Sequence, residues 1–296
     1  MAVSVTDPDS AAVTEAIRVS VPGSGLRQDL RAISIVWRRE IIRFKSDRLR
    51  AVTSLVQPVL FLFVLGAGLS SLASRGMPPG INFSTFIYPG VLSMSVLFTA
   101  IFSAASIVWD REFGFLREML VAPVSRSAIV IGKCLGGATV STFQGIIILA
   151  LAGLAHVPYD PILILTVIGE LLLLSFTLTA FGVMMAARIT QIQAFMALTQ
   201  MLVMPLFFLS GALYPLRSLP AWLAVLTRFD PITYAVYPMR HAVFSHLGIS
   251  PAANAALSPP ITWAGWAVPV GLSLGIVAAM GAVLLGMAIA EFQRTE

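Results

Sequence analysis

The chain has 296 residues, of which 57% are hydrophobic and 11% charged, and its mean hydropathy is +0.89. Soluble proteins are far less apolar, so this composition excludes a soluble enzyme held by one membrane anchor. The single cysteine, Cys134, also excludes an internal disulfide framework and a metal site built from cysteines. One span uses roughly 20 apolar residues, so the chain has room for six spans and the loops between them. We therefore expect an all-α integral membrane protein.

The amino-terminal part of the chain is polar and then strongly basic. Residues 1–26 lack the compact apolar core of a signal peptide, and we expect a flexible cytoplasmic tail there. Residues 27–50 carry a local charge of +5, equal to that of the whole chain. Apolar residues recur in this segment at steps of three or four, namely at Leu30, Ile33, Trp37, Ile41 and Phe44. This spacing predicts an amphipathic helix that lies in the membrane interface.

The basic face of this helix indicates membrane lipids as its partner. The side chains expected at the membrane interface are Arg38, Arg39, Arg43 and Lys45. A basic stripe directly ahead of a span, with aromatic residues on the opposite face, fits anionic lipid headgroups better than nucleic acid. We therefore expect no nucleic-acid partner.

Six apolar runs follow and predict six transmembrane helices in a domain that covers residues 51–291. The runs are residues 52–73, 87–108, 129–154, 162–187, 192–213 and 263–289. Residues 215–260 mix aromatic and charged side chains, which predicts an outer re-entrant helical segment before the last span, with a seventh span as the alternative. Residues 292–296 form a second cytoplasmic tail in this scheme.

The distribution of basic residues predicts the orientation. With the amino terminus inside, fifteen of the nineteen lysines and arginines lie on the inner side and four on the outer side. Because loops rich in lysine and arginine stay in the cytoplasm, we expect both termini to be cytoplasmic in a multi-pass protein of the cell membrane.

The connection at residues 109–127 is the most informative loop. Six of the eighteen residues from Trp109 to Arg126 are charged, so the loop must lie outside the hydrocarbon. Phe113, Leu116 and Leu120 fall on one helical face, and Pro123 would end this helix within about two and a half turns of its start. Such a helix either docks in a groove of a partner protein or lies on its own bundle as an ordinary connection.

The run from Trp109 to Arg126 resembles the cytoplasmic loop of ABC type-2 exporter permeases, especially the daunorubicin-resistance-like drug exporters. The basic helix, the six spans and the proline-rich outer segment extend this resemblance over nearly the whole chain. In the outer segment the family usually has Asn-Pro, whereas this chain has Asp230 before Pro231.

The resemblance implies a permease that pairs with a second copy or a paralogue and with two ATP-binding cassette ATPase subunits. The loop would be the coupling helix, and the residues implied for contact with the ATPase are Asp110, Arg111, Glu112, Phe113, Phe115, Leu116, Arg117 and Glu118. The chain contains no G-x-x-x-x-G-K-[ST] motif, since Gly132-Lys133 is followed by Cys134. We therefore expect no catalytic residue and no cofactor in this chain, with ATP and Mg bound by the partner.

The function implied by the resemblance is export of a hydrophobic or amphipathic drug, antibiotic or lipid, with a role in drug or antibiotic resistance. Export of a polysaccharide or glycolipid is the alternative within the same family. An alternative of another class is a secondary transporter driven by protons through Glu170, the one carboxylate well inside a predicted span. Glu170 would then lie on the transport path, whereas the simpler interpretation places it, protonated or hydrogen-bonded, between helices.

Other polar and small residues receive structural interpretations. Lys133 is near the cytoplasmic end of its span, where it can extend to water, and we expect no special role for it. Two glycine pairs, Gly132 with Gly136 and Gly271 with Gly275, have the spacing that lets helices pack closely, and we expect packing within the bundle, with a dimer contact as the alternative. The three histidines lack the spacing of metal ligands, and we expect no metal site.

Overall fold

A computed structural model describes residues 25–70, 81–115, 124–216, 219–263 and 265–294. Within these ranges the chain is helical apart from one hairpin, in which the strands β1 (Thr262–Trp263) and β2 (Trp266–Ala267) pair antiparallel. The turn of this hairpin contains Gly265 at φ +86°, a left-handed conformation that favours glycine. The prediction of an all-α protein is confirmed.

Six helical segments in the described residues are long and apolar enough to cross a membrane. In chain order they are α3 (Arg48–Leu60) continued by η1 (Phe61–Leu65) and α4 (Gly66–Gly68); α6 (Phe83–Ser103) continued by α7 (Ala105–Glu112); α9 (Arg126–Leu149); α10 (Pro161–Arg188); α11 (Ile192–Leu209); and α15 (Val270–Arg294). They follow the predicted order, and the prediction of six spans is confirmed.

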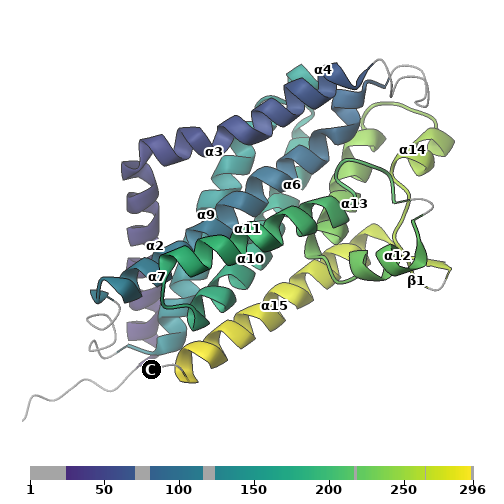
Figure 1. Cartoon of the computed structure of the whole chain (residues 1–296). Helices are drawn as coiled ribbons and strands as arrows, with labels where there is room; N and C mark the ends of the chain where they lie inside the picture. The colour runs from purple at the N-terminus through teal and green to yellow at the C-terminus, as the bar shows by residue number, and fades with distance from the viewer. Residues whose placement is uncertain (1–24, 71–80, 116–123, 217–218, 264, 295–296) are drawn as a thin grey trace, which may run out of the picture.

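The bundle surrounds α6, which is buried over most of its length. In contrast, α3, α11 and α15 keep most of their surface exposed. Figure 1 shows these helices running side by side, with α2, α7 and the carboxyl terminus at one end of the bundle and α12, α14 and β1 at the other. We call the first of these the charged end, because the ion pairs described below lie there.

The amphipathic helix exists as α2 (Leu26–Ser46), which crosses the charged end before the chain turns at Asp47 into α3 (Figure 1). Ala32, Val36 and Glu40 are buried, because this face of α2 packs against α9, whereas Leu30 of the predicted apolar stripe is 59% exposed.

Glycines on α9 allow this close approach. A Cβ atom added at Gly136 would lie 2.6 Å from Cβ of Glu40, and one at Gly132 would lie 2.8 Å from Cβ of Val36. The predicted packing role of this pair is confirmed. The same prediction is wrong for Gly271 and Gly275, where an added Cβ would meet no described atom within 4 Å.

The last span begins later than predicted, at Val270 instead of residue 263. Trp263 belongs to the hairpin, and its indole Nε1 donates a hydrogen bond of 3.0 Å to the Tyr234 hydroxyl. Pro269 then directly precedes the helix, at a position where its missing N–H costs no helical hydrogen bond. The predicted span was too long because Trp263, an apolar residue of the strand β1, was counted as part of the helix.

The segment before the hairpin forms three helices, α12 (Ala221–Thr227), α13 (Pro231–Ser245) and α14 (Pro251–Leu257). At 15 residues, α13 is shorter than a spanning helix needs to be, yet most of its side chains are buried among the spans. The short helix η3 (Ala152–Ala155) follows α9 at the same end of the bundle, where the Thr85 hydroxyl donates to the Ala155 carbonyl. This arrangement leaves six spans and no seventh in the described residues.

Candidate functional site

A buried lysine joins three elements at the charged end. Nζ of Lys133 on α9 lies 2.6 Å from Oε1 of Glu40 on α2 and 2.7 Å from Oδ2 of Asp110 on α7. It also donates to the hydroxyl of Ser106, at 3.0 Å. Because all three protons of an ammonium group can be donated, these contacts satisfy Lys133 fully. We call Lys133, Glu40, Asp110 and Ser106 the lysine cluster.

The cluster corrects the sequence interpretation of Lys133. The residue does not extend to water: it is only 4% exposed, and both of its carboxylate partners are also buried. Ion pairs in such surroundings are costly to break, because the remaining partner stays buried without compensation. The cluster therefore fixes α2, α7 and α9 to one another.

Two arginines of α2 extend the cluster toward the surface. Nη2 of Arg39 lies 2.7 Å from Oδ1 of Asp110, and Nη1 of Arg43 lies 3.7 Å from the same oxygen. The Arg43 guanidinium also stacks over the Trp109 ring at 5.0 Å. These two predicted interface residues thus contact the chain's own loop segment, whereas Arg38 and Lys45 are exposed.

The next two residues of α7 hold the turn between α10 and α11. The Arg111 guanidinium donates to the carbonyls of Ala186 (3.1 Å), Ala187 (3.1 Å) and Ile189 (2.8 Å), at the end of α10. Oε2 of Glu112 accepts a hydrogen bond of 3.2 Å from the backbone N–H of Ile192, the first residue of α11. We call Arg111 and Glu112 with this turn the helix-end clamp.

The loop residues that follow are exposed. The helix α7 ends at Glu112, and Gly114 adopts a left-handed φ of +81°. Most of the helix predicted for this loop, including Leu116 and Leu120, lies outside the described residues. Phe113 is 71% and Phe115 is 53% exposed. The other residues implied for coupling, Leu116, Arg117 and Glu118, lie outside the described residues.

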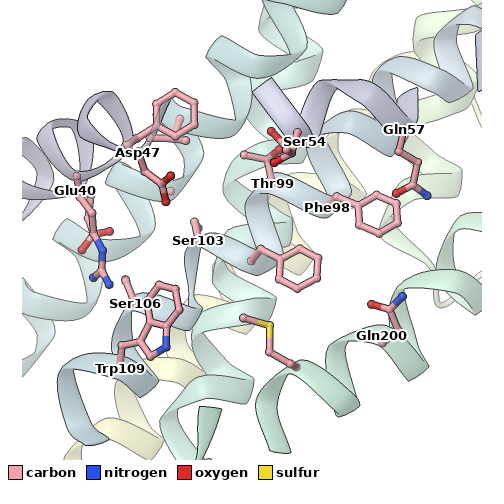
Figure 2. A pocket seen from close by; sticks show the side chains of 17 residues that line it. Glu40, Asp47, Ser54, Gln57, Phe98, Thr99, Ser103, Ser106, Trp109 and Gln200 are labelled. Carbon is pink, nitrogen blue, oxygen red and sulfur yellow. The ribbon is translucent and has the colours of Figure 1, made fainter. Parts of the chain in front are cut away.

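A cavity of about 510 Å³ opens beside the lysine cluster, between α2, α3, α6, α7, α9 and α11 (Figure 2). Its apolar lining consists of aromatic rings and one thioether, mainly Phe44, Phe98, Phe102, Trp109 and Met196. Its neutral polar lining consists of hydroxyls and amides, among them Ser54, Gln57, Thr99, Ser103 and Gln200. Figure 2 shows the amides of Gln57 and Gln200 extending toward one another from α3 and α11. Sequence reasoning missed this site, since its residues come from six separate elements.

Three charged residues also line this cavity. Glu40 is paired with Lys133, and Arg43 is held between Asp110 and Trp109. Asp47, at the end of α2, completes the charged lining. Because Glu40 and Arg43 have partners within the protein, the cavity presents mainly apolar and neutral polar surface to a ligand.

Glu170 lies apart from the cavity. It is buried on α10, only 5% exposed, and its Oε2 has no hydrogen-bond partner among the described residues. It does not belong to the cavity lining. The structure therefore separates Glu170 from the cavity beside the lysine cluster.

A second buried cation holds the opposite end of α11. Arg240 on α13 is 3% exposed, and its Nη2 donates to the carbonyls of Gly211 (2.9 Å) and Ala212 (3.0 Å) just after α11 ends. Its guanidinium lies 4.3 Å from the centre of the Phe86 ring. At the start of α13, Asp230 caps the helix through the N–H of Ile232, and burial raises the pKa of Asp230 to about 7. Aspartate thus serves as the cap at the position where the resembled family usually has asparagine.

Comparison with known proteins agrees with this arrangement. The family model described as "ABC-2 type transporter" matches residues 31–244. Nodulation protein J of Rhizobium leguminosarum bv. viciae is 25% identical over 75% of this chain and 84% of its own length. The inner membrane transport permease YadH of Escherichia coli strain K12 is 28% identical over 74% and 84%, respectively. "Probable multidrug ABC transporter permease YbhR" of the same strain is 31% identical over 53% of this chain and 43% of its own length.

Six spans, a charged loop segment tied to the bundle and an open cavity beside it define a membrane permease without an ATP-binding motif of its own. The chain belongs to the ABC-2 type transporter family. It is therefore a transporter permease subunit and not itself the ATPase. Permeases of this family pair with ATP-binding subunits, which use the ATP.

Proposed function

We propose that the chain is the membrane subunit of an ATP-driven exporter that moves a hydrophobic or amphipathic drug, antibiotic or lipid out of the cell, as in the daunorubicin-resistance-like permeases. The observation that carries this proposal is the 510 Å³ cavity. Its volume falls in the range of about 300–1,000 Å³ that is typical of sites for small organic ligands. Aromatic rings and a thioether offer dispersion contacts, while hydroxyls and amides offer hydrogen bonds.

This lining favours small amphipathic molecules over glycans. A saccharide chain presents many hydroxyls and needs polar partners along its length, whereas here aromatic rings and the Met196 thioether stand among the hydroxyls and amides of the wall. The word "multidrug" in the name of one relative points to the same substrate class. Export of a polysaccharide or glycolipid stays the alternative, and it would use the hydroxyls and amides of the same lining.

The proposed partners are two ATP-binding cassette subunits and a second permease, either an identical copy or a paralogue. The exposed Phe113 and Phe115 would contact the ATPase, together with Leu116, Arg117 and Glu118. Asp110 and Arg111 would instead pass its movement into the bundle, because both side chains bind other elements of this chain. Exposed Arg38 and Lys45 on α2 would contact lipid headgroups.

The proposed location is the cytoplasmic membrane, with the charged end and both termini inside the cell. The excess of lysine and arginine supports this orientation, because α2, α7 and the carboxyl terminus lie at the same end of the bundle (Figure 1). One relative is named as an inner membrane permease, which agrees with this location.

A pair of methionine variants on α11 tests the cavity. Met196 lines it, whereas Met201 on the same helix is 71% exposed and lies outside the lining. We expect Met196→Trp to fill the cavity and to lower ATP-dependent uptake of aromatic amphiphiles into inside-out vesicles about tenfold, the equivalent of ~1.4 kcal/mol. Met201→Trp should leave uptake unchanged. Equal uptake by both variants, or ATP-dependent uptake of labelled glycans alone, would refute the substrate class.

The proton-driven alternative is tested at Glu170. We expect export to require ATP and to be insensitive to a proton gradient, both in the native chain and in Glu170→Gln, because this acid lies outside the cavity lining. The measurement is uptake into vesicles with an imposed pH gradient, with and without ATP. Transport that follows the gradient without ATP, and that Glu170→Gln abolishes, would support the secondary transporter instead.

A further inference from the structure

The end of α7 contacts the two sides of the cavity in different ways. Consecutive residues of a helix point about 100° apart, so Asp110, Arg111 and Glu112 face three directions. Asp110 enters the lysine cluster and thereby holds α2 and α9. Arg111 and Glu112 hold the turn between α10 and α11. One short segment is thus bound to the elements that form opposite walls of the cavity.

The helix-end clamp matches the electrostatics of the two helices. The last carbonyls of a helix lack partners within it and carry partial negative charge, and Arg111 binds these groups of α10. The first N–H groups of a helix carry partial positive charge, and Glu112 accepts a hydrogen bond from one of them in α11. Hydrogen bonds that involve a charged group are stronger than neutral ones, so both contacts hold the turn more firmly than neutral side chains would.

The held helix carries the cavity wall. Met196 and Gln200 lie four and eight residues after Ile192, or about 6 and 12 Å along the helix. Only one face of α11 is buried in the bundle, at Phe195, Thr199, Val203 and Phe207. At its far end, Arg240 on α13 binds the carbonyls that follow the helix. The helix is therefore fixed at one end to the outer segment and at the other to α7.

We propose that Arg111 and Glu112 are positioning residues that make α11 follow the movement of α7. When the ATPase shifts α7, the opening of the cavity between Gln57 and Gln200 would therefore change. This inference rests on the proposed function, since it requires an ATPase that moves α7. It assigns both residues a role within the permease, where the resemblance had implied contact with the partner. The lysine cluster holds α2 and α9 while the helix-end clamp moves α11. The distance between these two walls of the cavity therefore changes.

A single introduced cysteine can report the movement of α11. Cys134 is the sole cysteine and is fully buried, so Cys134→Ala gives a background without a native thiol. In this background, Gln200→Cys places one thiol at the cavity wall. The labelling rate of this thiol by a membrane-permeant maleimide is measured in the complex with the co-purified ATPase, without nucleotide and after trapping with ATP and vanadate.

We expect trapping to change the labelling rate in the reporter background, and we expect Arg111→Ala and Glu112→Lys to abolish that change. Glu112→Gln retains an acceptor oxygen, so we expect it to preserve the change in labelling rate. This variant separates the effect of the hydrogen bond from that of the charge. The matched control is Arg188→Ala, which removes a cation from the same turn; Arg188 pairs with Glu291 on α15 and not with α7. Since Glu112 is exposed, Glu112→Lys keeps the test valid even if Arg111→Ala fails to fold.

The outcomes separate the inference from the proposed function. A wild-type response to trapping in Arg111→Ala and Glu112→Lys, with the ATPase still bound, would overturn the clamp. A reporter background that binds the ATPase but shows no response would also overturn it, while leaving the exporter proposal in place. If no ATPase co-purifies with the native chain, the proposed function fails. The inference about the helix-end clamp then fails with it, because nothing would move α7.

Discussion

Lys133→Met is expected to lower the free energy of unfolding of the permease by about 3–5 kcal/mol, the usual cost of removing one member of a buried ion pair. The substitution keeps the length of the side chain but leaves Glu40 buried without the cation that it contacts at 2.6 Å. Asp110 would lose one of its cations and keep Arg39. The measurement is the midpoint of unfolding in mixed detergent, followed by circular dichroism.

The matched control for this prediction is Lys45→Met, which removes the same charge from an exposed site on α2 and should change stability by less than about 0.5 kcal/mol. Adding Glu40→Gln and Asp110→Asn to Lys133→Met removes the charges together and should recover much of the loss, because no buried charge then lacks a partner. If Lys133→Met unfolds at the same midpoint as the native chain, the lysine cluster does not stabilise the charged end.

Phe113→Asp is expected to weaken binding of the ATPase about thirtyfold or more, the equivalent of the ~2 kcal/mol that a central aromatic contact provides in protein interfaces. The ring is 71% exposed and lines a surface hollow of about 680 Å³ together with Phe115, Trp109 and Arg43. A carboxylate at this position would lose the apolar contact and would have to be desolvated on binding. Binding is measured with the purified permease and its ATPase in detergent.

A phenylalanine at the opposite end of the bundle provides the control. Phe229 follows α12 and is 75% exposed, so Phe229→Asp makes the same chemical change far from α7 (Figure 1). It should leave ATPase binding unchanged. Native affinity in Phe113→Asp, or an equal loss in Phe229→Asp, would mean that this loop does not form the docking surface.

The spans could be predicted from the sequence because the hydrocarbon core imposes length and composition on each of them directly. The errors arose where apolar residues have another use. Trp263 was counted within the last span because it is apolar, although it packs on Tyr234 as part of a hairpin. The face of α2 that packs on the protein was not predicted, because it is set by the glycines of α9.

The charged residues could be predicted as a group but not in their pairing. Lys133 meets Glu40, which is 93 positions away in the chain, so only the tertiary fold brings them together. Arg111 and Glu112 had the composition of an exposed loop, and nothing in their spacing indicated a turn almost 80 residues further on. One signal was present: adjacent opposite charges suit the end of one helix and the start of the next.

The contact between Gly136 and Glu40 also constrains natural variation in this chain. A methyl group at position 136 would overlap the Glu40 side chain, so drift to alanine there demands a compensating change on α2. Because Glu40 also forms an ion pair with Lys133, a substitution at position 40 would break that ion pair. Orthologues should therefore inherit the glycine, the glutamate and the lysine as a set, or replace all of them together.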